Sequence, residues 1–106
     1  MSVPLYCVKS KEIKFDRRLL NPGERVTLLE PRIIDYGAVM IHGDGDPHVI
    51  VELKIESDIH VIEGNSIVIE PVVNKFVSIA VSNIGDTPGH SPTIEISFID
   101  WTGYGR

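Results

Sequence analysis

An alternation of apolar and polar residues is the feature that most constrains this chain. In "HVIVELKIE", residues 48–56, an extended backbone puts Val49, Val51, Leu53 and Ile55 on one face and mostly polar residues on the other. Successive side chains of a β-strand point to opposite faces. The segment therefore predicts a half-buried strand with a largely solvated outer face.

The same period recurs through most of the sequence. Further strands are predicted at 25–30, 32–41, 59–63, 66–70, 75–83 and 93–101, with shorter candidates in "LYCV" and "EIKF". Turn residues separate them, including "NPGE" at 21–24 and "EGN" around Gly64, and Pro31 marks a bend or an edge. No segment carries a convincing helical stripe. We predict an all-β chain, an antiparallel β-sandwich or jelly roll of about seven or eight short strands with little or no helix.

Length and composition fit one folded domain over residues 1–106. Hydrophobic residues make up 42% of the 106 residues and charged residues 24%, ordinary values for a globular protein. We expect no signal peptide, because the N-terminus lacks a basic start followed by a long apolar stretch. We expect no transmembrane segment, because no apolar run approaches the roughly 18 to 20 residues that span a bilayer. The single cysteine, Cys7, is expected to be a small buried strand residue. A cytoplasmic or virion location follows as an expectation.

Charge is distributed unevenly along the chain. The net charge of −5 argues against nucleic acid as the main partner. Residues 1–33 carry seven Lys/Arg and four Asp/Glu, whereas residues 34–106 carry three and eleven. One copy's basic segment could therefore meet another copy's acidic surface, although an unevenly charged solvated surface explains the same numbers. The basic residues expected at such an interface are Lys9, Lys11, Lys14, Arg17 and Arg18.

Two histidines and two aspartates alternate at His42, Asp44, Asp46 and His48. These side-chain types suit a transition metal. On an extended strand they would span about 20 Å, too far for one ion, so the segment must fold back to form a site. Its Gly, Asp and Pro residues predict a plain hairpin loop, with a cupin-like metal site as the weaker alternative. No cofactor is expected.

Catalytic motifs are lacking in the sequence. No G-x-S-x-G, P-loop or dinucleotide-binding pattern occurs, and His60 and His90 stand alone. Trp101 and Tyr104 could form a carbohydrate-stacking platform, or the tryptophan could close one end of the core. Ile50, Ile99 and Trp101 fall on nominally outer strand positions, as residues that meet another subunit do. These features favour a non-enzymatic interaction module over an enzyme.

The pattern "LLNPGERVTLLEPR…GDGDPHVIVELKIE…FVSIAVSNIGDTP" resembles small β-sandwich virion proteins of phages and archaeal viruses. The resemblance covers residues 19–100 and lies in the order of turns and strands. It implies a structural subunit of a viral particle or tail that associates with itself or with another structural protein. It implies no catalytic residues. A carbohydrate-binding or other ligand-binding sandwich is the alternative.

Overall fold

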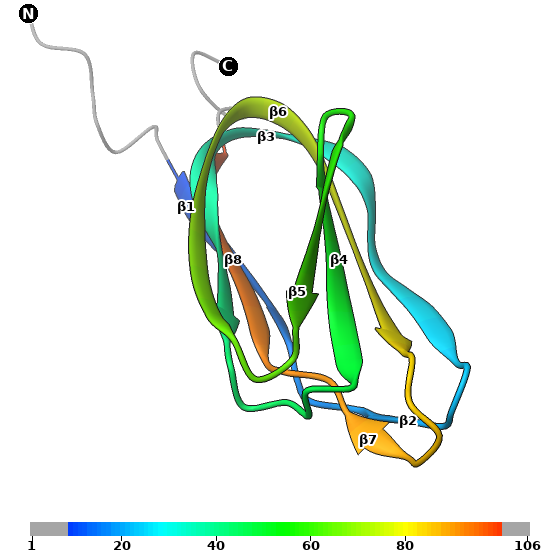
Figure 1. The fold of residues 1–106 in the computed structure, drawn as a ribbon. Helices are drawn as coiled ribbons and strands as arrows, with labels where there is room; N and C mark the ends of the chain where they lie inside the picture. The colour runs from blue at the N-terminus through cyan, green and yellow to red at the C-terminus, as the bar shows by residue number, and fades with distance from the viewer. Residues whose placement is uncertain (1–8, 101–106) are drawn as a thin grey trace, which may run out of the picture.

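Two long strands dominate the structure, a computed structural model that describes residues 9–100 (Figure 1). β3 (Arg25–His42) and β6 (Ile67–Asn83) pair antiparallel along their lengths and form one bent ribbon. The other strands are β1 (Lys9–Phe15), β2 (Leu19–Leu20), β4 (Val49–Ile55), β5 (Asp58–Glu63), β7 (Gly89–His90) and β8 (Ile94–Asp100). The predicted all-β class is confirmed. Residues 9–100 contain no helix, and so none that could cross a membrane.

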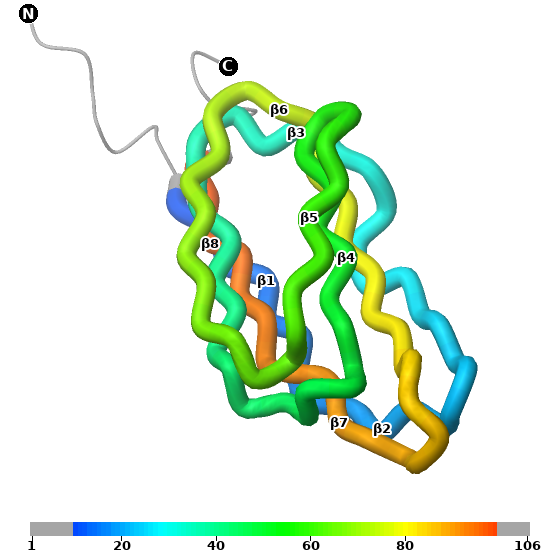
Figure 2. The backbone as a smooth tube through the Cα atoms, viewed as in Figure 1, coloured from blue at the N-terminus to red at the C-terminus, as the bar shows by residue number. Residues whose placement is uncertain are grey.

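The bent ribbon belongs to two layers at once. The larger sheet has the order β1-β8-β3-β6-β4-β5, and β2 and β7 form a separate two-stranded sheet. β8 pairs with residues 37–41 of β3, whereas β4 pairs with residues 77–83 of β6. We call β1, β8 and the ribbon half that joins them (37–42 and 67–73) the first layer. The second layer is β4, β5 and the other ribbon half, so the ribbon arches from one layer to the other (Figures 1 and 2).

Two bulges lie in the second-layer half of β3. Between Thr27 and Leu29, and again between Leu29 and Arg32, β3 advances one residue more than β6 does. Pro31 lies within the second irregularity, where its missing N–H costs no regular ladder bond. At the bend itself Asn74 has a φ of 51°, a left-handed conformation that asparagine tolerates better than most residues.

The core lies between the layers and is built by the predicted strand faces. Val49, Val51 and Leu53 of β4 are at most 1% exposed, and the inward residues of β6 and β8 join them in one cluster. The full cluster is Leu20, Leu29, Ile34, Val39, Ile41, Val49, Val51, Leu53, Val72, Val77, Ile79, Val81, Ile94, Ile96 and Phe98. Burying each such side chain contributes about 1.5–3 kcal/mol, which makes this cluster the main source of stability.

The predicted turns are confirmed, whereas two predicted strand breaks are wrong. Glu24 N–H donates to Asn21 O at 3.0 Å, with Gly23 at a φ of 80°, and Ser66 N–H donates to Glu63 O at 2.9 Å. Segments 25–30 and 32–41 form one strand, because the bulge around Pro31 bends the ladder without ending it. Segments 66–70 and 75–83 likewise form one strand. The candidate "LYCV" lies outside the described residues.

Candidate interaction surfaces

The segment with the alternating histidines and aspartates crosses from one layer to the other. It leaves β3 in the first layer and enters β4 in the second. β3 pairs with β6 and β8, and β4 pairs with β5 and β6, so the predicted hairpin between β3 and β4 is wrong. The glycines and Pro47 turn the chain as expected, but the ladder partners lie elsewhere in the sequence.

The two aspartates of this segment attach it to the stretch that runs from β7 into β8. Asp44 accepts hydrogen bonds from the backbone N–H of Thr93 at 2.7 Å and from its hydroxyl at 2.8 Å. Asp46 accepts one from the backbone N–H of His90 at 2.7 Å, and its own N–H donates to His90 O at 2.9 Å. Both carboxylates therefore hold the segment in place through hydrogen bonds to backbone N–H groups.

The histidines of the segment have other partners. His42 Nε2 lies 3.3 Å from Glu95 Oε2, and His48 Nε2 lies 3.2 Å from the carbonyl oxygen of Thr87. The His48 ring packs so closely against Gly85 and Gly89 that neither position has room for a Cβ. Within residues 9–100, no three His, Cys, Asp or Glu side chains come together in a way that could hold a metal ion. The four candidate ligands are thus dispersed over separate partners.

The environment of Asp44 alters its acidity. Slight burial raises the pKa of this carboxyl, but the two hydrogen bonds from Thr93 and the nearby charge of Arg17 outweigh that effect. The net result is a pKa below the ordinary value of 3.8. The carboxylate is therefore ionised, and able to accept both bonds, throughout the neutral range.

Buried polar groups close the same end of the sandwich. Asn83 is 1% exposed, and its Nδ2 donates to Leu20 O at 3.0 Å and to Thr87 O at 2.9 Å. Ser91 is fully buried and bonds with the backbone of Arg18. Sequence reasoning missed both residues. The burial of Asn83 could have been predicted, because it is the next residue after Val77, Ile79 and Val81 on the face of the strand that points into the core. A polar residue there requires hydrogen-bond partners.

An apolar row runs along the outer face of the first layer. Ile67, Ile69 and Val73 of β6 are 77%, 61% and 57% exposed, and Tyr36 of β3 is 57% exposed beside them. The side chains of all four residues point away from the core. We call these four residues the outer apolar row. The sequence does not reveal this row, because "IVIEPVV" has apolar residues at both odd and even positions and alternation alone cannot identify the exposed face.

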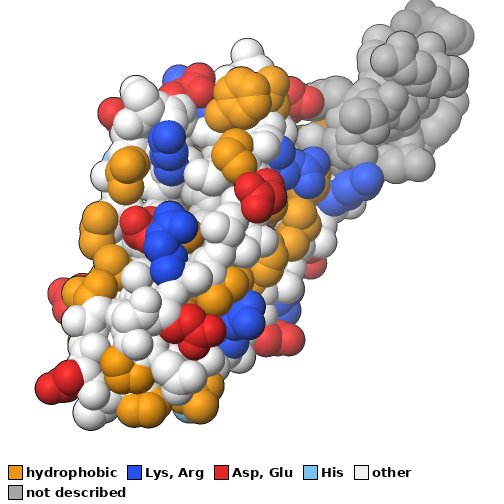
Figure 3. Space-filling model, turned by 90° about the vertical axis from the view of Figure 1, so that its right-hand side faces the viewer, with side chains coloured by type: hydrophobic (Ala, Val, Ile, Leu, Met, Phe, Trp, Pro, Cys, Tyr) orange, Lys and Arg blue, Asp and Glu red, His pale blue; other side chains and the backbone are white. Residues whose placement is uncertain are grey.

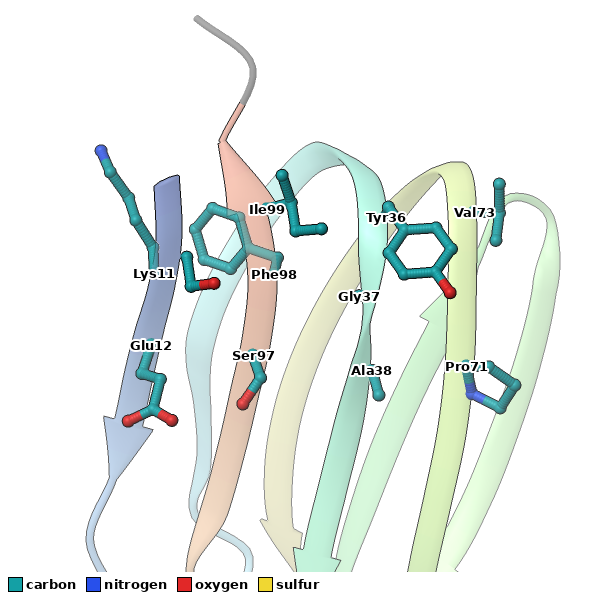
Figure 4. A pocket seen from close by; sticks show the side chains of 11 residues that line it. Lys11, Glu12, Tyr36, Gly37, Ala38, Pro71, Val73, Ser97, Phe98 and Ile99 are labelled. Atoms are coloured by element: carbon teal, nitrogen blue, oxygen red, sulfur yellow. The ribbon is translucent and has the colours of Figure 1, made fainter. Parts of the chain in front are cut away.

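A hollow of about 500 Å³ adjoins this row on the first layer (Figure 4). Ile99 and Tyr36 lie on either side of Gly37, which forms part of the floor, and Val73 lies beyond Tyr36. A Cβ on Gly37 would meet the backbone of β8, so glycine is required for the strands to pair here. The lining is Ser10, Lys11, Glu12, Tyr36, Gly37, Ala38, Pro71, Val73, Ser97, Phe98 and Ile99.

The residues predicted at an interface are spread over several places. Lys9, Lys11 and Lys14 belong to β1, with Lys11 and Lys14 exposed. Arg17 and Arg18 are exposed in the loop that follows. Ile99 lines the first-layer hollow. Ile50 is half-buried on the outer side of β4 in the second layer, so the structure does not bring it near Ile99. Trp101 and Tyr104 lie outside the described residues.

The outer face of the second layer has a different character. Figure 3 shows this side of the molecule, where hydrophobic side chains are interspersed with charged ones of both signs. Arg25 Nε lies 2.8 Å from Glu52 Oε2 there, and Lys54 is exposed close by. Small residues, Ser78 and Ala80, lie between them in a shallow hollow of about 260 Å³. A charged mosaic of this kind suits a solvated surface better than a docking face.

In the six-stranded sheet of the described part of the chain, four strand edges have no second strand beside them: β1, β5, and one half each of β3 and β6. β1 pairs with β8 alone and β5 with β4 alone. On one side of the bend, residues 67–73 of β6 pair with β3 alone. On the other side, residues 25–34 of β3 pair with β6 alone. Unpaired edges are ready to accept a further strand unless bulges, prolines or charges prevent it.

Comparisons with protein-family models, with curated proteins and with solved structures found no match. The resemblance to virion proteins therefore stays a prediction from the sequence.

Proposed function

We propose that this protein is a non-enzymatic structural or interaction module that associates with copies of itself or docks on a larger assembly. The observation that supports this proposal is the outer apolar row beside the hollow on the first layer. Three large aliphatic side chains of this row, Ile67, Ile69 and Val73, are more than half exposed on outward positions of one strand, with the exposed Pro71 between Ile69 and Val73.

The energetics favour covering such a surface. Burying an isoleucine or valine side chain contributes about 1.5–3 kcal/mol, so a partner that covers the row gains several kcal/mol before the cost of association is subtracted. Scattered exposed hydrophobic residues are normal in monomers, whereas a contiguous row is typical of an interface. Given the resemblance seen in the sequence, we propose a viral particle or tail as the larger assembly.

Light scattering tests the proposal directly. At tens of micromolar the wild-type chain is expected to have a mass above that of one chain, and Ile69→Lys is expected to lower it by placing a charge in the row. Ile59→Lys is the matched control, because Ile59 is 60% exposed, almost as much as Ile69, but lies on β5 of the second layer. A wild-type mass of one chain, with no larger partner retained by the row, would contradict the proposal.

The hollow supports a second candidate function, a ligand-binding module. Its volume of about 500 Å³ lies within the usual range for small-molecule sites, and Tyr36 offers an aromatic face at its edge. Trp101, the single tryptophan, follows Ile99 by two positions in the chain and serves as a fluorescence reporter. Titration with glycans is expected to shift Trp emission if this candidate holds. A flat response across a broad panel, together with no effect of Tyr36→Ala, would exclude it.

A further inference from the structure

We infer that copies of this chain join edge to edge, with β1 of one copy pairing alongside residues 67–73 of the next and extending the first layer. The inference rests on the proposed self-association and names its surfaces. The two edges lie at opposite ends of the same four-strand layer, which has the order β1, β8, β3, β6. A strand added at one end therefore continues the sheet without a change of layer.

The two edges match in length and in availability. β1 has 7 residues, and the part of the β6 edge in the first layer, residues 67–73, spans the same number. Each presents backbone N–H and C=O groups along the side that faces away from its one partner strand. Pro71 lies in the second edge, a position that proline occupies on edge strands and avoids in central ones.

The other two edges are less suited to accept a strand. The half of β3 in the second layer carries two bulges and Pro31, which disrupt the spacing that a new ladder requires. Arg32, on the same edge, folds its guanidinium over the Phe98 ring at 4.9 Å from the centroid and so covers the side of the core. β5 is exposed along most of its length but belongs to the second layer, to which β1 does not lead.

Charge distinguishes the two matching edges. Residues 9–18 hold five basic and two acidic residues, a net charge of +3. The opposite edge, residues 67–73, holds Glu70 and no Lys or Arg, a net charge of −1. Glu70 is half-buried. Opposite charge on the two edges favours contact between unlike edges and opposes contact between like ones.

Such a contact is heterologous, because one copy uses a different surface from the next. Heterologous contacts repeat, and they close into rings or continue as filaments according to the rotation between copies. The outer apolar rows of successive copies would then lie on one face of the extended sheet, which gives a larger partner a continuous surface.

Charge reversal with a swap tests the inference. Lys11→Glu/Lys14→Glu makes the β1 edge acidic, and Glu70→Lys makes the opposite edge basic. Each variant alone is expected to associate at least about tenfold more weakly than wild type, whereas an equimolar mixture of the two is expected to recover the wild-type mass, since each reversed edge meets its new complement. Lys54→Glu is the matched control, because Lys54 is an exposed lysine on β4 of the second layer, away from the two edges.

The wild-type chain provides a second measurement that needs no variant. Its mass is expected to fall as salt is raised from about 0.1 M to about 1 M, where the screening length shrinks from about 10 Å to about 3 Å. If wild type is a single chain at every salt concentration, both this inference and self-association fail. If wild type associates but the two reversed variants associate equally well, or their mixture recovers nothing, the edge-to-edge contact is wrong while self-association stands.

Discussion

At the scale of single residues, the loop end of the sandwich is held by side chains that bond to backbone. Asn83 donates twice through Nδ2, to Leu20 O and Thr87 O, and its Oδ1 accepts from the N–H of Gly85 at 2.9 Å. One buried amide thus links the β2 strand, the end of β6 and the loop after it. A buried hydrogen-bonded group of this kind stabilises the fold only while all its partners are met.

Replacing Asn83 with alanine is expected to destabilise the protein by about 2–3 kcal/mol, because Leu20 O and the N–H of Gly85 lose this partner and Thr87 O keeps only the contact with His48. Denaturant unfolding followed by circular dichroism measures the change. Asn65→Ala, the same substitution at an exposed turn position, should cost no more than about 0.5 kcal/mol. Equal losses in the two variants would show that Asn83 does not bridge these loops.

Acid should weaken the wild-type protein more than it weakens Asp44→Asn. The folded-state pKa of Asp44 is lowered from 3.8, so its contribution to stability is present above that value and is lost as pH falls through the lower, folded pKa. Unfolding free energies measured from about pH 5 to pH 3 should therefore slope more steeply in wild type. Thr93→Val, which removes the hydroxyl donor, should give an intermediate slope. Parallel profiles for all three proteins would contradict this assignment.

At the scale of strands, alternation predicted which faces are buried but not where strands end. Val77, Ile79 and Val81 are buried as their parity predicts. The sequence predicted two strands, 25–30 and 32–41, where the structure has one. A bulge at Pro31 and a strand break have the same appearance in a sequence. Local period also says nothing about which strand lies alongside which, and so the crossing from β3 to β4 resembled a hairpin.

Gly37 is expected to be essential to the pairing of β3 with β8. Its missing side chain lets β8 approach, since a Cβ there would lie 2.9 Å from Phe98 Cα. Gly37→Ala should cost at least about 2 kcal/mol, measured by thermal and denaturant unfolding. Gly23→Asn serves as the control, because nothing lies within 4 Å of a Cβ there and asparagine tolerates its φ of 80°. A Gly37→Ala variant as stable as wild type would rule out the close approach.

At the scale of the whole molecule, the sheet joins segments far apart in the chain. β1 lies beside β8, and β3 pairs with β6 across two intervening strands. Long-range pairing of this kind is fixed by the packing of the complete core, which no local window contains. The sequence predicted Ile99 and the basic β1 residues as interface candidates. It did not reveal the outer apolar row, because the buried face of residues 67–73 is known only once their pairing with β3 and the packing of the layers are known.

This topology predicts slow folding. Non-local strand pairs form only after long loops close, so refolding of this β-sandwich should take about milliseconds to seconds. Stopped-flow circular dichroism measures it, at protein concentrations low enough to exclude association. Refolding complete within tens of microseconds would show that local contacts guide folding more than the strand order implies.

The register of β1 with β8 has a mechanical consequence. Lys9 pairs with Asp100, so the described chain enters and leaves the sheet at the same point. A pulling force applied between these two residues would act on one backbone pair at a time and would unzip β1 from β8 instead of shearing all seven pairs together. An assembly that loads the molecule through those ends would therefore gain strength from a neighbour that clamps β1 in place.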